Sequence, residues 1–254
     1  MAEKFRIWHH AGLTSCLTIR LHEMCKYRHE YGHLPEDIEC SDLFLQYRDF
    51  EKQDVNEKLM APYIPDNSLP DVYFKHSWQF KWYKKVDLVD LSKLAMGVCT
   101  PSEAVLKKAA ELAPLTEGRT AILYRGNDKQ KEIRETPYEA IVAMARETGN
   151  TKFIVQTDEE EFYFYFKNIF PDCVAFEEIP RIKKNSESFV LPEEGKRVEF
   201  AVNFLAALIA LSKCRTACIT TGNVALWFML FRGNMDGVWQ YHGGKRKYKK
   251  LLKK

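Results

Sequence analysis

The stretch 120–156, TAILYRGNDKQKEIRETPYEAIVAMARETGNTKFIVQ, predicts a strand, a polar loop, a helix and a second strand. The apolar runs 120–124 and 152–156 have the length of strands, and Pro137 lies where a helix over 138–148 would begin. Strands that alternate with helices build parallel sheets. This stretch therefore predicts an α/β fold.

The alternation continues towards the C-terminus. Further strands are expected at residues 174–179, 217–221 and 238–241, and further helices at residues 197–213 and 224–231. Another helix is expected after Thr157-Asp158, which has the pattern of a helix N-cap before the acidic first turn Glu159–Glu161. The strands are continuous apolar runs, as in sheets covered by helices on both faces. Ligands bind such sheets at the loops beyond the carboxyl ends of the strands. Here those loops begin at Arg125, Thr157 and Gly222.

The N-terminal half carries a weaker pattern. It predicts strands at residues 5–9 and 72–75, a loop at 10–15, and helices at 16–28 and 102–112. We divide the chain into an N-terminal domain, an α/β domain and a basic tail. Their expected bounds are residues 1–116, 117–242 and 243–254.

Composition narrows the class of protein. The net charge of +3 becomes −4 without the last twelve residues, which hold seven basic side chains and no acidic one, so no broad nucleic-acid-binding face is expected. The seven cysteines form no CxxC pair, which favours a reducing compartment. No apolar run approaches the roughly 20 residues that span a bilayer, and the N-terminus lacks a signal-peptide pattern. We expect a cytoplasmic protein without an integral membrane segment.

The first motif, YRGNDK at residues 124–129, follows a predicted strand directly. The Arg125 guanidinium suits bidentate capture of a diphosphate, and Gly126 lets the backbone approach a ligand closely. Asp128 could orient Arg125 or bind a sugar hydroxyl. The alternative is an ordinary polar turn between a strand and a helix.

The second motif, TTGNVALW at residues 220–227, precedes a predicted helix. Free N–H groups and the helix dipole make such a position a phosphate site, here at Thr221, Gly222 and Asn223. The alternative is a Gly-Asn turn in which Asn223 only caps the helix. Because parallel strands end at the same edge of a sheet, both motifs are expected to lie together.

The order of these features resembles the donor-binding half of the fucosyltransferase superfamily. An Arg-containing loop comes first, followed by the Thr-Asp pair, the long apolar helix and the Thr-Thr-Gly-Asn turn. That superfamily includes the α-1,6-, nodulation and protein O-fucosyltransferases. Residues 121–239 also look like small glycosyltransferases of bacteria and large DNA viruses, through 221–223, Trp227 and the Phe-Arg-Gly-Asn stretch 231–234. The resemblance covers about half the chain.

The resemblance implies a GT-B architecture: two Rossmann-like domains with parallel sheets and a donor in the inter-domain cleft. It implies an inverting transfer from a nucleotide sugar, with GDP-fucose the commonest donor, to a carbohydrate acceptor, without metal or cofactor. Arg125 would hold the diphosphate with Asp128 beside it, and Asp158 would face the nucleoside or sugar. Phosphate would also be held by Thr221, Gly222 and Asn223. The other domain would contact the donor through His10, Gly12 and Ser15. The nucleotide and the sugar are left open, because this chain has one Arg in the motif where two are common.

The resemblance also suggests a base for the acceptor hydroxyl. Glu132 lies where the α-1,6 family places its base, and His10 is the second candidate. Trp78 and Trp82 could form a platform for an acceptor sugar, although such aromatic residues also serve as simple packing. The basic tail could touch an anionic surface or be a solubilising end.

Two alternatives to a transferase stay open. His29-Glu30-Tyr31-Gly32-His33 fits the H-E-x-x-H pattern of zinc hydrolases, in which two histidines lie one helical turn apart. Gly32 would end the helix and move His33 off its face. The other alternative is a non-catalytic protein of the same fold that binds glycan or protein.

Overall fold

The computed structural model describes residues 4–50, 55–76, 86–127, 136–184, 191–242 and 245–246. Its strands are β1 (Phe5–Arg6), β2 (Ile38–Glu39), β3 (Thr120–Tyr124), β4 (Phe153–Thr157), β5 (Thr216–Ile219), β6 (Val238–His242) and β7 (Lys245–Arg246). Its α-helices are α1 (Leu13–Tyr31), α2 (Val55–Leu59), α3 (Leu88–Val98), α4 (Glu103–Leu112), α5 (Tyr138–Glu147), α6 (Glu160–Ile169), α7 (Arg197–Ser212) and α8 (Asn223–Arg232). The part of the chain that the structure describes also includes the short 3-10 helices η1 (Leu45–Tyr47) and η4 (Ala113–Thr116).

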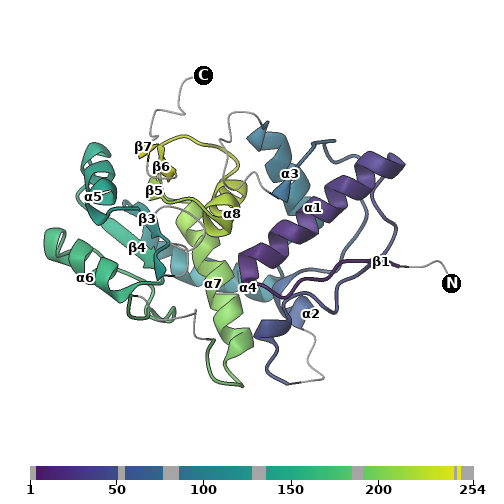
Figure 1. Cartoon of the computed structure of the whole chain (residues 1–254), viewed down its shortest axis with the longest axis horizontal. Coiled ribbons are helices and arrows are strands. Elements are labelled where there is room, and N and C mark those ends of the chain that lie inside the picture. The colour runs from purple at the N-terminus through teal and green to yellow at the C-terminus, as the bar shows by residue number, and fades with distance from the viewer. Residues whose placement is uncertain are drawn as a thin grey trace.

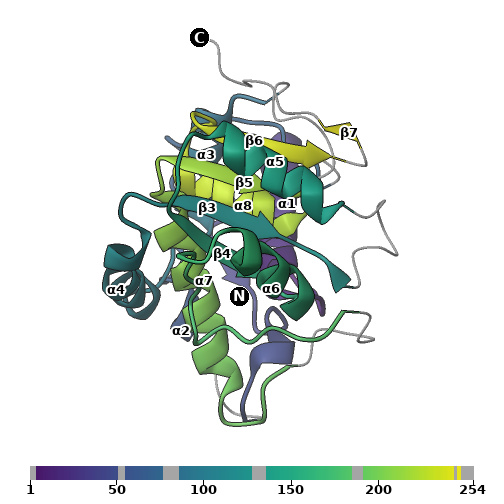
Figure 2. The same ribbon diagram turned by 90° about the vertical axis from the view of Figure 1, so that its left-hand side faces the viewer.

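The larger sheet has the strand order β4-β3-β5-β6-β7. Strands β4, β3, β5 and β6 pair in parallel, and β7 pairs with β6 in antiparallel fashion. Figure 2 shows these strands stacked one above the other, with helices on both sides. The α/β class and the parallel sheet predicted from the sequence are confirmed.

Alternate residues of each strand enter two different cores, which explains why the strands are continuous apolar runs. Ile122 and Tyr124 pack with α5 and α6 on one face of the sheet. Ala121 and Leu123 pack on the other face with α7, α8 and the N-terminal helices. In Figure 1, α5 and α6 lie to the left of the sheet, and α7, α8 and α1 lie to its right.

The described residues of the N-terminal half form a small parallel sheet, β1 with β2, and the α-helices α1 to α4. Its buried side chains belong to the same core cluster as those of α7 and α8. Figure 1 shows α1 and α3 beside α8, with α2 and α4 near α7. The division at residues 116 and 117 stays a prediction, and of the tail the structure describes only the backbone of β7.

Two buried polar groups join the halves. The Asp49 carboxylate accepts hydrogen bonds from the backbone N–H groups of Gly195, Arg197 and Val198, at 2.7–3.1 Å, and so caps the start of α7. On α1, the Thr18 hydroxyl accepts a hydrogen bond from Trp227 Nε1 of α8 at 3.0 Å. These contacts fix α7 and α8 against the N-terminal half.

Three of the expected strands are shorter or absent. Residues 174–179 contribute a single bridge between Val174 and Ile154, because the chain turns away before Pro180. Residues 72–75 form no strand, and the strand expected over 5–9 is paired only at Phe5–Arg6. These segments lie at sheet edges or inside the N-terminal half, where the partner strand and not the local pattern decides pairing.

The start of α6 also differs from the expectation. Thr157 accepts a hydrogen bond from the N–H of Glu159 at 3.1 Å, and the helix begins one residue later, at Glu160. A bridge between Glu159 and Ile182 keeps the chain extended at that point. Asp158 therefore does not cap the helix, and its carboxylate binds Arg125 and the Gly126 N–H instead.

Within the part of the chain that the structure describes, every helix is too short or too polar to cross a bilayer. All seven cysteines are free and buried. Burial raises the pKa of six of these thiols, to about 11 for Cys16 and about 12 for Cys99, which keeps them protonated and unreactive.

Candidate functional site

A cavity of about 720 Å³ lies between the two halves of the chain, at the carboxyl ends of β3, β4 and β5. One wall comes from residues 11–15 and 46–47 and His76 of the N-terminal half. The opposite wall comes from the loops that follow β3, β4 and β5, and α7 supplies Phe200 and Phe204. Both motifs, YRGNDK and TTGNVALW, are predicted from the sequence to lie at this edge of the sheet.

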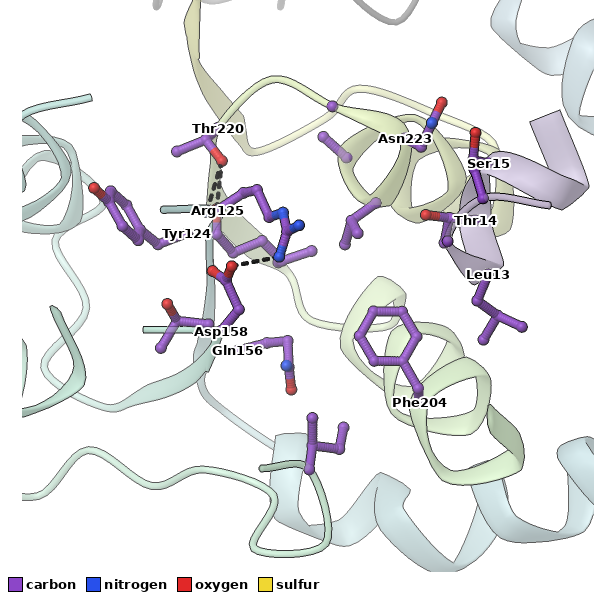
Figure 3. A pocket seen from close by; sticks show the side chains of 18 of the residues that line it. Leu13, Thr14, Ser15, Tyr124, Arg125, Gln156, Asp158, Phe204, Thr220 and Asn223 are labelled. Atoms are coloured by element: carbon purple, nitrogen blue, oxygen red, sulfur yellow. Dashed lines mark hydrogen bonds and ion pairs between the residues drawn. The ribbon is translucent and has the colours of Figure 1, made fainter. Parts of the chain in front are cut away.

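Arg125 supplies a positive charge to the wall that belongs to the sheet. Its guanidinium forms an ion pair and hydrogen bond with the Asp158 carboxylate, and the two side chains are 28% and 10% exposed. The other carboxylate oxygen of Asp158 accepts the Gly126 N–H at 3.0 Å. Among the described residues, Asp158 therefore orients the guanidinium at the cavity wall (Figure 3).

The turn after Arg125 is fixed to the neighbouring loop by its backbone. Asn127 has φ 36°, its N–H donates to Glu159 Oε2 at 3.2 Å, and its Nδ2 donates to the Asp158 carbonyl oxygen at 3.0 Å. The Arg125 N–H donates to Thr220 Oγ1 at 3.0 Å, which ties the turn to the end of β5 as well. Arg125 is thus held on a rigid support.

We expect Gly126→Ala to destabilise the protein by about 1–3 kcal/mol, because a Cβ there would lie 1.9 Å from Oε2 of the fully buried Glu159. Thermal unfolding measures this change. The control is Gly12→Ala across the cavity, where φ is −55° and the nearest atom to an added Cβ is 3.9 Å away. Equal melting temperatures for the two variants would contradict the close contact between Gly126 and Glu159.

The N-terminus of α8 forms the second element of this wall. Gly222, with φ 154°, is the N-cap residue and has no side chain to cap the helix. The first intrahelical bond joins the Leu226 N–H to the Gly222 carbonyl oxygen, so the preceding N–H groups belong to the free helix end. The Thr221 hydroxyl donates to the Tyr241 carbonyl oxygen, and Asn223 Oδ1 lies 3.0 Å from Thr18 Oγ1. Backbone N–H groups at this turn are therefore placed to contact a phosphate.

The N-terminus of α1 faces this helix end from the other wall. Gly12 precedes α1 without a side-chain cap, and the Leu13 N–H donates to the Tyr47 hydroxyl at 2.9 Å. Burial raises the pKa of Tyr47 to about 12, so this residue stays a neutral phenol. Figure 3 shows Leu13, Thr14 and Ser15 across the cavity from Arg125 and Asp158.

Two helix N-termini and one guanidinium therefore meet at one cavity. Each helix end carries a partial positive charge, and together with Arg125 they favour an anion with several oxygens. The rest of the lining is largely apolar, with side chains suited to covering a ring. It includes Leu13, Leu123, Ile179, Pro180, Leu191, Phe200, Phe204 and Val224.

The structure brings most of the predicted site residues together. Those that line this one cavity are Gly12, Ser15, Arg125, Asp158, Thr221, Gly222 and Asn223. His10 is exposed and stacks on Trp8 with ring centroids 6.0 Å apart, outside the lining. The predicted roles of Asp128, Glu132, Trp78 and Trp82 stay predictions, because these four lie outside the described residues.

Sequence reasoning missed several residues of the site. Tyr47, Gln46 and His76 line the cavity from segments without a clear periodic pattern, and Thr220 supports Arg125. His9, next to the predicted His10, contacts Ser15. Two of these could have been found locally, because Thr220 opens the TTGNVALW motif and His9 ends the predicted first strand, directly before the predicted loop at 10–15.

The H-E-x-x-H segment does not form a pair of histidines on one helix face. Helix α1 ends at Tyr31, and Gly32 has φ 77°, as expected for a left-handed helix end. The His29 ring contacts Tyr73, whereas the His33 ring contacts Tyr27. Among the residues that the structure describes, no three His, Cys, Asp or Glu side chains are grouped so that they could hold a metal ion.

Comparison of the sequence with models of protein families, and with curated proteins, finds no match. Solved structures of the fucosyltransferase NodZ are similar over nearly the whole chain. NodZ from Bradyrhizobium has a TM-score of 0.58 at 13% identity, covering 96% of this chain and 98% of NodZ. NodZ α-1,6-fucosyltransferase soaked with GDP-fucose gives 0.59 at 12% identity, covering 97% of each chain. The form co-crystallised with GDP gives 0.55 at 14% identity, covering 95% and 96%. The chain therefore has the GT-B-type α/β fold of the fucosyltransferase NodZ, as the resemblance predicted.

Proposed function

We propose that this protein is a glycosyltransferase that moves a sugar from a nucleoside diphosphate sugar to a carbohydrate acceptor. The observation that carries this proposal is the meeting of Arg125 with the N-termini of α1 and α8 at one cavity. This arrangement suits a diphosphate. The cavity volume lies within the range of about 300–1,000 Å³ that small-molecule sites occupy.

The donor that we propose is a GDP-sugar such as GDP-fucose. NodZ structures soaked with GDP-fucose or co-crystallised with GDP have the same fold, which supports this choice of nucleotide. The apolar lining, including Phe200 and Phe204, suits the base or the sugar ring. We place the reaction in the cytoplasm, which the seven free cysteines support.

In the proposed reaction, an acceptor hydroxyl attacks the anomeric carbon on the face opposite the diphosphate, which inverts its configuration. The bond from that carbon to the diphosphate oxygen breaks, and its electron pair leaves with the nucleoside diphosphate. Arg125 and the helix ends stabilise this charge, the role that a metal ion plays in other transferases, so we propose a metal-independent reaction. Asp158 positions Arg125. Glu132 is the base that the family pattern suggests.

GDP is expected to raise the melting temperature more than UDP or CDP. A ligand at 100 times its dissociation constant stabilises the folded state by about 2.7 kcal/mol, or several degrees for a chain of this size. The measurement is a thermal shift with each nucleotide and nucleotide sugar. If none of them changes the melting temperature, the proposed function is wrong.

Turnover separates an enzyme from a non-catalytic binder of the same fold. We expect the wild type to hydrolyse GDP-fucose slowly in the absence of an acceptor, with GDP release as the readout. A GDP-dependent thermal shift without any hydrolysis or transfer would favour the binding protein.

A further inference from the structure

A serine–histidine contact lies in the cavity wall formed by the N-terminal half. Ser15 lines the cavity, and its Oγ lies 3.1 Å from Nε2 of His9. The His9 ring is half-buried and is not itself part of the lining. Ser15 therefore stands between the imidazole and the space where a substrate would bind.

Both residues are held in place by the backbone. Ser15 belongs to the first turn of α1, and its N–H donates to the Gly12 carbonyl oxygen at 2.8 Å. Next to β1, the His9 N–H donates to the Asp42 carbonyl oxygen at 3.4 Å. The contact thus joins the end of the short sheet to the start of the helix, and it needs no rearrangement to form.

We infer that Ser15 and His9, in place of the Glu132 that the resemblance suggests, form a proton relay that accepts the proton of the acceptor hydroxyl. This inference rests on the proposed transferase function. The acceptor O–H proton passes to Ser15 Oγ while the Ser15 proton passes to His9 Nε2. The acceptor oxygen bonds to the anomeric carbon, and the nucleoside diphosphate leaves with the electron pair of the broken bond. The imidazolium then releases its proton to solvent.

The surroundings of His9 favour a neutral ring, the form that accepts a proton. Burial lowers the pKa of His9, and the nearby His10 and His76 lower it further. The ring centroids of His9 and His10 are 5.9 Å apart. His76 lines the cavity. On the neighbouring strand end, Asp42 is paired with Arg6. A relay through His9 therefore operates at neutral pH and fails as falling pH protonates the ring.

The test uses hydrolysis of GDP-fucose, with water in place of the unidentified acceptor. We expect His9→Gln to lower kcat about 100-fold, within the range for loss of a general base, with an unchanged GDP-dependent thermal shift. In the wild type, kcat/KM should fall on the acidic side as His9 becomes protonated, and in His9→Gln this fall should disappear.

Ser15 is tested by two substitutions. Ser15→Ala should lower kcat about tenfold, because a water molecule can partly replace the hydroxyl. Ser15→Thr keeps the hydroxyl and should restore most of the rate. A purely structural role for the contact would change the melting temperature but would leave the shape of the pH profile unchanged.

His22→Gln is the matched control. His22 is also half-buried with one hydrogen-bond contact, Nδ1 to the Phe74 carbonyl oxygen at 3.3 Å, but lies outside the cavity lining. It should retain wild-type kcat and pH profile. The relay is wrong if His9→Gln keeps its turnover or its acidic limb, or if Glu132→Gln alone abolishes turnover. In each case a retained GDP shift leaves the transferase proposal standing.

Discussion

Replacing Arg125 by alanine should lower kcat for GDP-fucose hydrolysis by about 100- to 1,000-fold and weaken GDP binding. The substitution removes the one guanidinium that faces the cavity among the lining residues, and with it the stabilisation of the leaving diphosphate. It also removes the ion-pair partner of Asp158, so that the Asp158 carboxylate would repel an anionic ligand. Arg125→Lys should restore little, because an ammonium group cannot make the same bidentate contacts.

Arg119 supplies a matched control for Arg125. The two arginines flank the same strand, β3, at opposite ends, and Arg119 donates to the Asp172 carbonyl oxygen at 3.5 Å, outside the cavity lining. Arg119→Ala should therefore leave GDP binding and hydrolysis unchanged.

A double substitution tests the role of Asp158. If repulsion by the unpaired carboxylate contributes to the loss, Arg125→Ala combined with Asp158→Asn should bind GDP more tightly than Arg125→Ala alone. Isothermal titration measures the affinities. Wild-type GDP affinity in Arg125→Ala would show that the diphosphate does not bind at this guanidinium.

Trp227→Ala should destabilise the protein by about 3–5 kcal/mol, which lowers the melting temperature of a chain of this size by on the order of 10 °C. Trp227 is 0% exposed and lies in the core cluster shared by both halves. Its Nε1 donates to Thr18 of α1, so the substitution leaves a cavity and removes a contact between α8 and α1.

Trp8→Ala is the matched control, because the Trp8 side chain is 63% exposed and a surface substitution changes stability by about 0.5 kcal/mol or less. Trp227→Phe separates the two parts of the effect, since it keeps most of the buried ring and removes only the N–H donor. It should cost less than half as much as the alanine substitution. A melting temperature for Trp227→Ala within two degrees of the wild type would contradict the observed burial.

The sequence predicted the C-terminal α/β layer well. The apolar runs 120–124 and 217–221, the long helix near 197–213 and the turn at Gly222 are local signals, and the structure contains an element at each of them. The edge shared by Arg125 and Gly222 followed from them, because parallel strands present their carboxyl ends on one side of a sheet.

Other features depend on contacts between distant segments and were missed or misplaced. Residues 174–179 have strand-like side chains, but only Val174 finds a partner. Asp158 has the sequence pattern of a helix cap, yet its carboxylate binds a guanidinium 33 positions earlier in the chain. Local propensity cannot predict either outcome, since it carries no information about which distant group is available.

The candidate site divides in the same way. By itself, the sequence determined an arginine after one strand and a helix start at Gly222-Asn223 after another, because turn chemistry and hydrophobic periodicity are local. Only the tertiary structure decided that α1 presents its N-terminus to the same cavity, that Tyr47 binds the first N–H of that helix, and that His9 rather than His10 contacts Ser15. These features join segments from both halves of the chain, and the packing of α1 and α8 around Trp227 brings those segments together.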